Sequence, residues 1–104
     1  MSWIYLLAAG IFEVIWAYAM KLSDGFTRPV PTLVMIVGMI GSFALLTLAM
    51  RDLPLGTAYT IWTGIGAVGA FLLGIIMLGE VVSPARMAAA LLIISGMVLM
   101  KLSS

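Results

Sequence analysis

The chain has 104 residues, of which 64% are apolar and 9% are charged, and its formal net charge is +1. A water-soluble domain has about half apolar and about a quarter charged residues, so this composition predicts a membrane protein. The absence of cysteine and histidine excludes thiol chemistry, imidazole bases and Cys/His metal sites, and so small a charge does not favour a nucleic-acid partner. We expect no cofactor.

Polar breaks divide the chain into four apolar segments, each about the 20 residues that a helix needs to cross a hydrocarbon core of roughly 30 Å. The segments are Trp3–Met20, Pro31–Met50, Thr57–Leu78 and Ala85–Leu102. Lipid offers the backbone no hydrogen-bond partners and no alternating strand pattern is present, so each segment is expected to be a helix. The connections are short, and residues 1–104 are therefore predicted to form one all-α domain of four transmembrane helices.

The first segment carries an acidic residue, Glu13, in the middle of an otherwise apolar stretch. A charge near the bilayer centre is costly, so such a residue is expected to face a protein interior or a watery cavity. Removal from water favours a neutral carboxyl group, and Glu13 can then exchange a proton for a cation. The alternative is a protonated acid that only links helices by hydrogen bonds. We favour function, because no other charge lies near the middle of a segment.

The helical neighbours of Glu13 suit a binding site. Gly10 lies three residues before it and Ala17 four residues after it, so both small residues share its face. Trp16 borders this face, where its ring can stack on a cation and its indole N–H can donate to a carboxylate; the alternative is an interfacial anchor. Ala17 and Ala19 form a small-x-small pattern that resembles a signal-peptide cleavage site, but no basic residue precedes the segment, and we expect it to be retained.

The second and third segments add polar and aromatic candidates. Ser42, at mid-span, can orient a carboxylate or bond back to its own helix. Tyr59 and Trp62 lie on one helical face and can form aromatic walls, although Tyr59 alone is equally typical of an interfacial belt. Gly64 and Gly66 weaken the same helix, so they predict a kink or hinge.

The fourth segment has the features of a helix–helix contact. Ala89 and Gly96 are small residues seven positions apart, so they lie on one face. Small residues let helices approach closely in a membrane. We therefore expect this segment to form a dimer interface.

Basic residues are almost evenly divided between the two sides of the membrane. One side holds Arg51 and Lys101, whereas the other holds Lys21, Arg28 and Arg86. Orientation normally follows an excess of basic residues on the cytoplasmic side, so this near-balance predicts insertion in both orientations and pairing of oppositely oriented copies. The alternative is one weakly favoured orientation.

Three motifs give the whole chain a resemblance to the small multidrug resistance family of bacterial transporters. They are "EV" at Glu13–Val14, "K-x-S-x-G-F-T-R" at Lys21–Arg28 and "P-x-G-x-A-Y-x-I-W-x-G-x-G" at Pro54–Gly66. The resemblance implies an antiparallel dimer in the bacterial inner membrane that exchanges protons for cations at paired glutamates. It also implies that the two copies pack through the fourth helix.

Within that family, "WAYAMK" at Trp16–Lys21 and "GTAYTIWTGIGAVGA" at Gly56–Ala70 resemble the guanidinium-exporting branch. The resemblance implies that Glu13 binds substrate and proton. The pocket residues that it implies are Gly10, Trp16, Ser42, Tyr59 and Trp62. Guanidinium is planar and offers N–H donors to a carboxylate, whereas a quaternary ammonium ion has no donors and relies on aromatic faces.

The sequence thus predicts a proton-coupled antiporter that exports guanidinium by alternating access, assembled as an antiparallel homodimer and not an enzyme. Two alternatives remain open at this point. One is a broader multidrug exporter of quaternary ammonium cations with the same mechanism, and the other is a partner subunit of a related chain.

Overall fold

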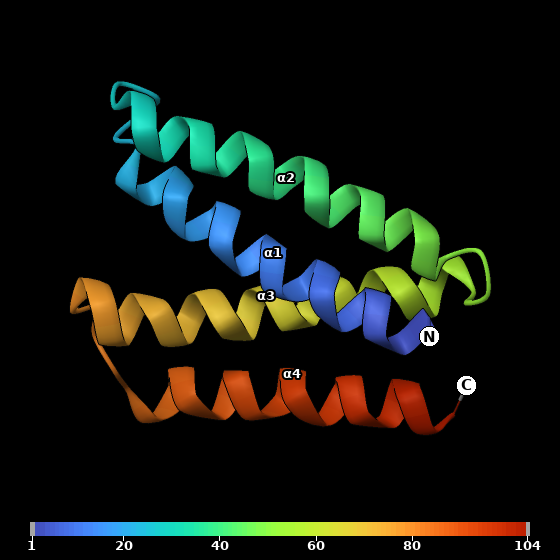
Figure 1. Cartoon of the computed structure of the whole chain (residues 1–104). Coiled ribbons are helices and arrows are strands. Elements are labelled where there is room, and N and C mark those ends of the chain that lie inside the picture. Colours follow the sequence, from blue (N-terminus) through green and yellow to red (C-terminus); the bar gives the residue numbers. More distant parts are fainter. Residues whose placement is uncertain (1, 104) are drawn as a thin grey trace.

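The computed structural model describes residues 2–103, which form four α-helices (Figure 1). They are α1 (Ser2–Leu22), α2 (Pro29–Ala49), α3 (Leu55–Leu78) and α4 (Pro84–Leu102). Each helix is long and apolar enough to cross a membrane, which confirms the predicted all-α membrane fold. The helix ends differ from the predicted segments by no more than two residues, since α2 and α4 already begin at a proline.

The helix ends follow from local chemistry. A proline at the first helical turn lacks only an N–H that would have no partner in the helix, which suits the starts of α2 and α4. Ser83 caps α4, because its hydroxyl accepts the Arg86 backbone N–H at 3.2 Å. Gly79 ends α3 in the left-handed conformation, with a φ of 68° that side chains disfavour.

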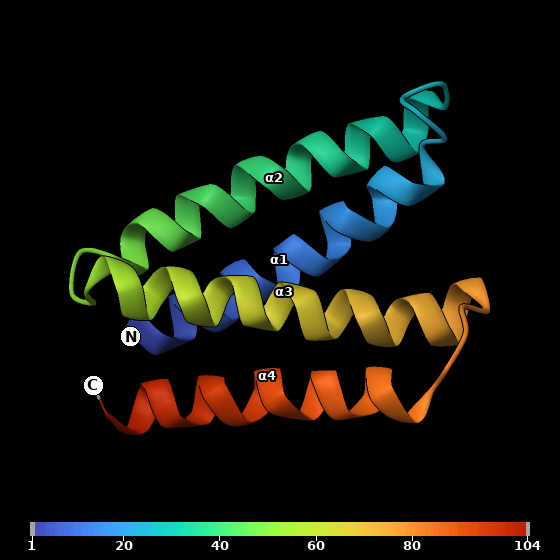
Figure 2. The ribbon, with the colours of Figure 1, turned by 180° about the vertical axis from the view of Figure 1, so that it is seen from behind.

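The four helices form a thin layer in the order α2, α1, α3, α4, in which the first half of α1 crosses over α3 (Figures 1 and 2). The layer measures 41 × 34 × 16 Å, so it is thin compared with its other two dimensions. Among these helices, the backbone of α4 comes close to α3 alone, while the Lys101 ammonium group of α4 lies 5.3 Å from the centroid of the Trp3 ring of α1. The pair α1–α2 lies closest to α3 near the N-terminus and diverges from it toward the opposite end (Figure 2).

A small apolar core forms where α1, α2 and α3 converge. Its buried members are Leu6, Ala9, Leu46, Ala49, Ala58, Ile61 and Trp62. They come from the first half of α1, the end of α2 and the start of α3, so this end of the layer is the firmly packed one.

Glycines allow α1 and α3 to approach closely beyond this core. In three contacts a glycine on one helix meets a larger side chain on the other, namely Gly10 with Ile65, Gly66 with Glu13 and Gly69 with Val14. A methyl group added at any of these glycines would collide with the opposing side chain. The two helices are therefore held together through the middle of the predicted membrane span.

Candidate functional site

The acidic residue of the first helix lies at the α1–α3 contact. Glu13 is partly buried, and its carboxyl group rests against Gly66 of α3. Its Oε1 atom is buried without a hydrogen-bond partner among residues 2–103. Buried polar atoms in folded proteins are almost always hydrogen-bonded. The carboxyl group is therefore expected either to take up a proton or to accept a hydrogen bond from a ligand.

Trp16 lies one turn further along the same helix, and it too has a buried polar atom without a hydrogen-bond partner. Its indole Nε1 is buried and makes no hydrogen bond within the described part of the chain. Its backbone and Cβ pack against Gly38 of α2, where an added methyl group would come within 3.0 Å of the Trp16 Cβ. An unsatisfied donor and an unsatisfied acceptor therefore occur one turn apart on α1.

Four aromatic rings form a continuous series across the helices. Ring centroids are 6.4 Å apart for Trp16 and Phe43, 5.8 Å for Phe43 and Trp62, and 5.6 Å for Trp62 and Tyr59. All three pairs are tilted, an arrangement that aromatic rings prefer to face-to-face stacking. Phe43 joins the predicted aromatic residues of α1 and α3, although sequence reasoning did not select it. Its only signal was its place beside Ser42.

Ser42 and Trp62 are linked in a buried chain of hydrogen bonds. The Trp62 indole N–H donates to the Ser42 hydroxyl at 2.9 Å, and that hydroxyl donates to the Ala9 carbonyl at 2.7 Å. Ser42 is 0% exposed and Trp62 is 7% exposed, whereas Tyr59 is 52% exposed. The Ser42 proton therefore goes to the backbone of α1, neither to the Glu13 carboxylate nor to its own helix, and it fixes α2 and α3 one turn before Glu13.

The glycines predicted to line or bend the site have packing roles in this structure. Gly10 faces Ile65 of α3, and Gly64 faces Met97 of α4. The helix α3 runs unbroken from Leu55 to Leu78 through Gly64 and Gly66. A hinge at these two glycines therefore stays a prediction.

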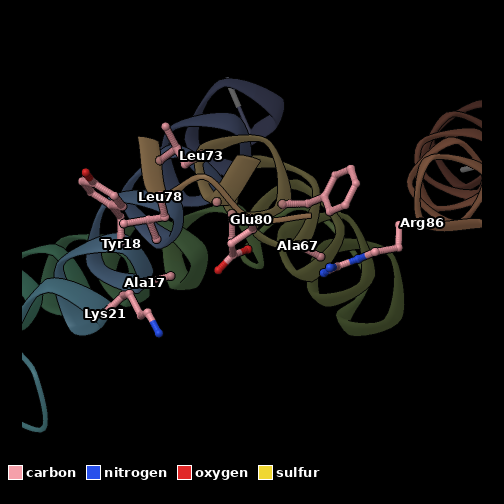
Figure 3. Close-up of a pocket in the computed structure, with 11 residues that line it drawn as sticks. Ala17, Tyr18, Lys21, Ala67, Leu73, Leu78, Glu80 and Arg86 are labelled. Carbon is pink, nitrogen blue, oxygen red and sulfur yellow. The ribbon is translucent and has the colours of Figure 1, made fainter. Parts of the chain in front are cut away.

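A cavity of about 360 Å³ opens between α1 and α3 beyond Glu13 (Figure 3). Its lining residues are Ala17, Tyr18, Lys21, Ala67, Ala70, Phe71, Leu73, Gly74, Leu78, Glu80 and Arg86. Ala17 shares the Glu13 face, so the cavity begins one helical turn from the carboxyl group. In the view of Figure 3, Glu80 lies between Lys21 and Arg86. The cavity thus extends from the level of the charged loops to about one helical turn from Glu13.

The predicted dimer helix has an open surface. No residue of α4 is buried, and a methyl group added at Gly96 would meet nothing within 4 Å. Ala89 is exposed as well, and it borders a small cavity of about 250 Å³ against α3. Room for a partner therefore exists along α4, and the dimer interface stays a prediction.

A metal site has no support in residues 2–103, where no three metal-ligating side chains come together. The candidate site consists instead of one carboxyl group, an indole donor and a series of aromatic rings. Such a site can bind a cation and a proton.

The chain is similar to known proteins from end to end. A family model described as Small Multidrug Resistance protein matches residues 1–102. Relatives named "Guanidinium exporter" are 55% identical in Citrobacter freundii and Salmonella typhimurium and 51% identical in Escherichia coli (strain K12). Each comparison spans 104 residues, which is 100% of this chain and 99% of the relative. The similarity therefore includes all four helices and the whole candidate site.

Proposed function

Since the chain belongs to the Small Multidrug Resistance family, we propose that it exports guanidinium ion across the membrane in exchange for protons. Support comes from relatives that are named guanidinium exporters and are 51% to 55% identical over the full length. The four apolar helices and the family make the chain a multi-pass protein of the bacterial inner membrane.

The observation that carries this proposal is the buried Glu13 Oε1 atom, which has no donor among the described residues. Guanidinium is planar and presents parallel N–H donors that match the edge of a carboxylate. A buried carboxylate requires a charged, hydrogen-bonding partner, and guanidinium supplies both the charge and the donors. A proton neutralises the same group, so proton and guanidinium compete for Glu13. This competition couples their movements.

The transport cycle follows from that competition. Guanidinium binds the ionised Glu13 carboxylates from the cytoplasmic side, the protein changes conformation, and the same site then opens outward. Protons displace the cation there, and the protonated protein returns. We propose that the ring series of Trp16, Phe43, Trp62 and Tyr59 forms the aromatic wall of the binding site, since aromatic faces also attract cations.

An antiparallel homodimer is part of the proposal. A layer 16 Å thick is too thin for one copy to enclose a site at mid-membrane. A second copy in the opposite orientation would cover the first and bring a second Glu13 to the same chamber. The near-balance of basic residues favours such pairing, and the exposed small residues Ala89 and Gly96 of α4 offer a surface for it.

The decisive experiment is transport by the purified full-length chain in liposomes. We expect an electrical current on addition of guanidinium, and we expect Glu13→Gln to abolish it while helicity is unchanged. The amide has nearly the same shape as the acid but carries no charge and takes up no proton. Proton-driven guanidinium export by Glu13→Gln would contradict the mechanism.

Two other functions are outcomes of the same experiment. Comparable currents with tetrapropylammonium would identify a multidrug exporter, because that cation has no N–H donors and would need only aromatic faces and volume. If neither cation gives a current with the chain alone, but a current appears after co-expression with a related chain, the protein is a subunit of a heterodimer.

A further inference from the structure

We propose, on the basis of the function proposed above, that Gly66 is a positioning residue for the transport site. Because Gly66 lacks a side chain, a recess remains between α1 and α3, and the Glu13 carboxyl group lies in it. Gly66 thus decides where the carboxylate is held and thereby how well guanidinium can reach it. This role differs from that of a hinge in α3.

The contact at Gly66 is made by Glu13 itself. The three heavy atoms closest to an added Cβ at Gly66 are Oε1, Cδ and Cγ of Glu13. Gly66 is buried, so the new methyl group could not turn toward lipid. The carboxyl group would have to leave the recess.

The neighbouring contacts prevent the helices from simply moving apart at this point. Gly10 receives Ile65 on one side of the recess, and Gly69 receives Val14 on the other. Both flanking contacts join apolar side chains to backbone, so they fix the spacing of α1 and α3 without involving a charge. Gly66 alone among the three glycines meets the carboxyl group.

The carboxyl oxygen has no donor in this recess. Gly66 offers none because it has no side chain, and Oε1 is buried without a hydrogen bond in the described part of the chain. A displaced carboxyl group would reach other surroundings and would lose this arrangement. The affinity for guanidinium should therefore depend on a residue that never touches the substrate.

The test is a double-mutant cycle on the purified full-length protein, with equilibrium guanidinium binding measured by calorimetry. We expect Gly66→Ala to raise Kd by about tenfold or more, because small misplacements of a reacting group are costly. Glu13→Asp shortens the side chain by one methylene and withdraws the carboxyl group from Gly66. In the Glu13→Asp background, the fold-increase in Kd caused by Gly66→Ala should be smaller than in the native background, by a factor of about five or more.

Gly69→Ala is the matched control. It makes the same substitution in the same helix and also collides with α1, but its collision partner is the apolar Val14. Its effect on Kd should be equal in the Glu13 and Glu13→Asp backgrounds. The proposal is overturned if Gly66→Ala leaves Kd unchanged, or if its effect is the same in both backgrounds. A hinge would give that second result together with a slower current.

Thermal unfolding tests the geometry without any ligand. Gly66→Ala should lower the Tm in the native background, and Glu13→Ala should relieve that loss because the colliding carboxyl group is gone. If Gly66→Ala prevents folding even with Glu13→Ala, then Gly66 serves helix packing alone and the proposal fails. Guanidinium binding by Glu13→Gln would overturn the proposed function instead. The Tm comparison would still test the contact between Gly66 and Glu13, because it involves no ligand.

Discussion

At the scale of single residues, the hydrogen bonds from Trp62 to Ser42 and from Ser42 to Ala9 join three helices at one buried point. In lipid and protein interiors an unpaired donor cannot turn to water, so both partners are needed together. Ser42 therefore has a structural role besides its proposed place in the pocket. It holds the Trp62 ring within the aromatic series.

We predict that Ser42→Ala destabilises the protein by about 1 to 3 kcal/mol, because the Trp62 indole N–H then lacks its acceptor. Trp62→Phe combined with Ser42→Ala should cost less than the sum of the two single changes. Unfolding in detergent with increasing denaturant measures these differences.

Ser95→Ala is the matched control for this prediction. The Ser95 hydroxyl donates to Leu91 O of its own helix at 2.8 Å, and the residue is exposed. Its removal should change stability by less than about 0.5 kcal/mol. Equal losses for Ser42→Ala and Ser95→Ala would mean that the buried chain of hydrogen bonds is not a special feature.

At the scale of helices, the two ends of α3 use glycine differently. Gly79 ends the helix at a φ of 68°, whereas Gly56 lies in the first helical turn with an ordinary backbone. Neither position has another atom within 4 Å of an added Cβ. The two glycines therefore differ in backbone conformation but not in the space around them.

We predict that Gly79→Ala destabilises the protein by about 1 kcal/mol, since alanine disfavours the left-handed region. Gly56→Ala should be neutral or should stabilise by up to about 1 kcal/mol, because alanine is the better helix former. Thermal unfolding of the two variants side by side checks both signs. A stabilising Gly79→Ala would contradict the left-handed helix end.

The number, length and order of the helices could be predicted from the sequence, because apolar segments of membrane-spanning length carry that information directly. The residues that face each neighbouring helix could not be predicted in this way. A helix that is apolar on all sides has no distinct buried face, so nothing in the second segment marked Phe43 as a neighbour of Trp16 and Trp62. Glu13 was different, because one charge in a long apolar segment requires an explanation wherever the helix points.

At the scale of the whole molecule, the thin layer leaves most of its apolar side chains exposed. The last helix is the extreme case, with no buried residue and with a backbone that comes close to α3 alone among the four helices. Apolar exposure is normal toward lipid, but small residues on an exposed helix are typical of helix contacts. The open α4 surface is therefore where a change should affect assembly and leave the single chain intact.

We predict that Gly96→Leu converts the proposed dimer to monomer, while Gly96→Ala weakens it only slightly. In either variant the new Cβ meets nothing within 4 Å in the single chain, and position 96 is exposed. Light scattering after size-exclusion chromatography measures the mass, and circular dichroism verifies the helices. A Gly96→Leu protein that remains dimeric would place the interface elsewhere.

The position of α4 at the edge of the layer also has a consequence for synthesis in the cell. The buried core residues and the glycine contacts around Glu13 belong to the first three helices, which leave the ribosome first. These helices can reach their final packing before the last helix enters the membrane. In each newly synthesised chain, the recess around the Glu13 carboxyl group should therefore form before the α4 surface is available for dimerisation. Dimer assembly would then be the last step of biogenesis.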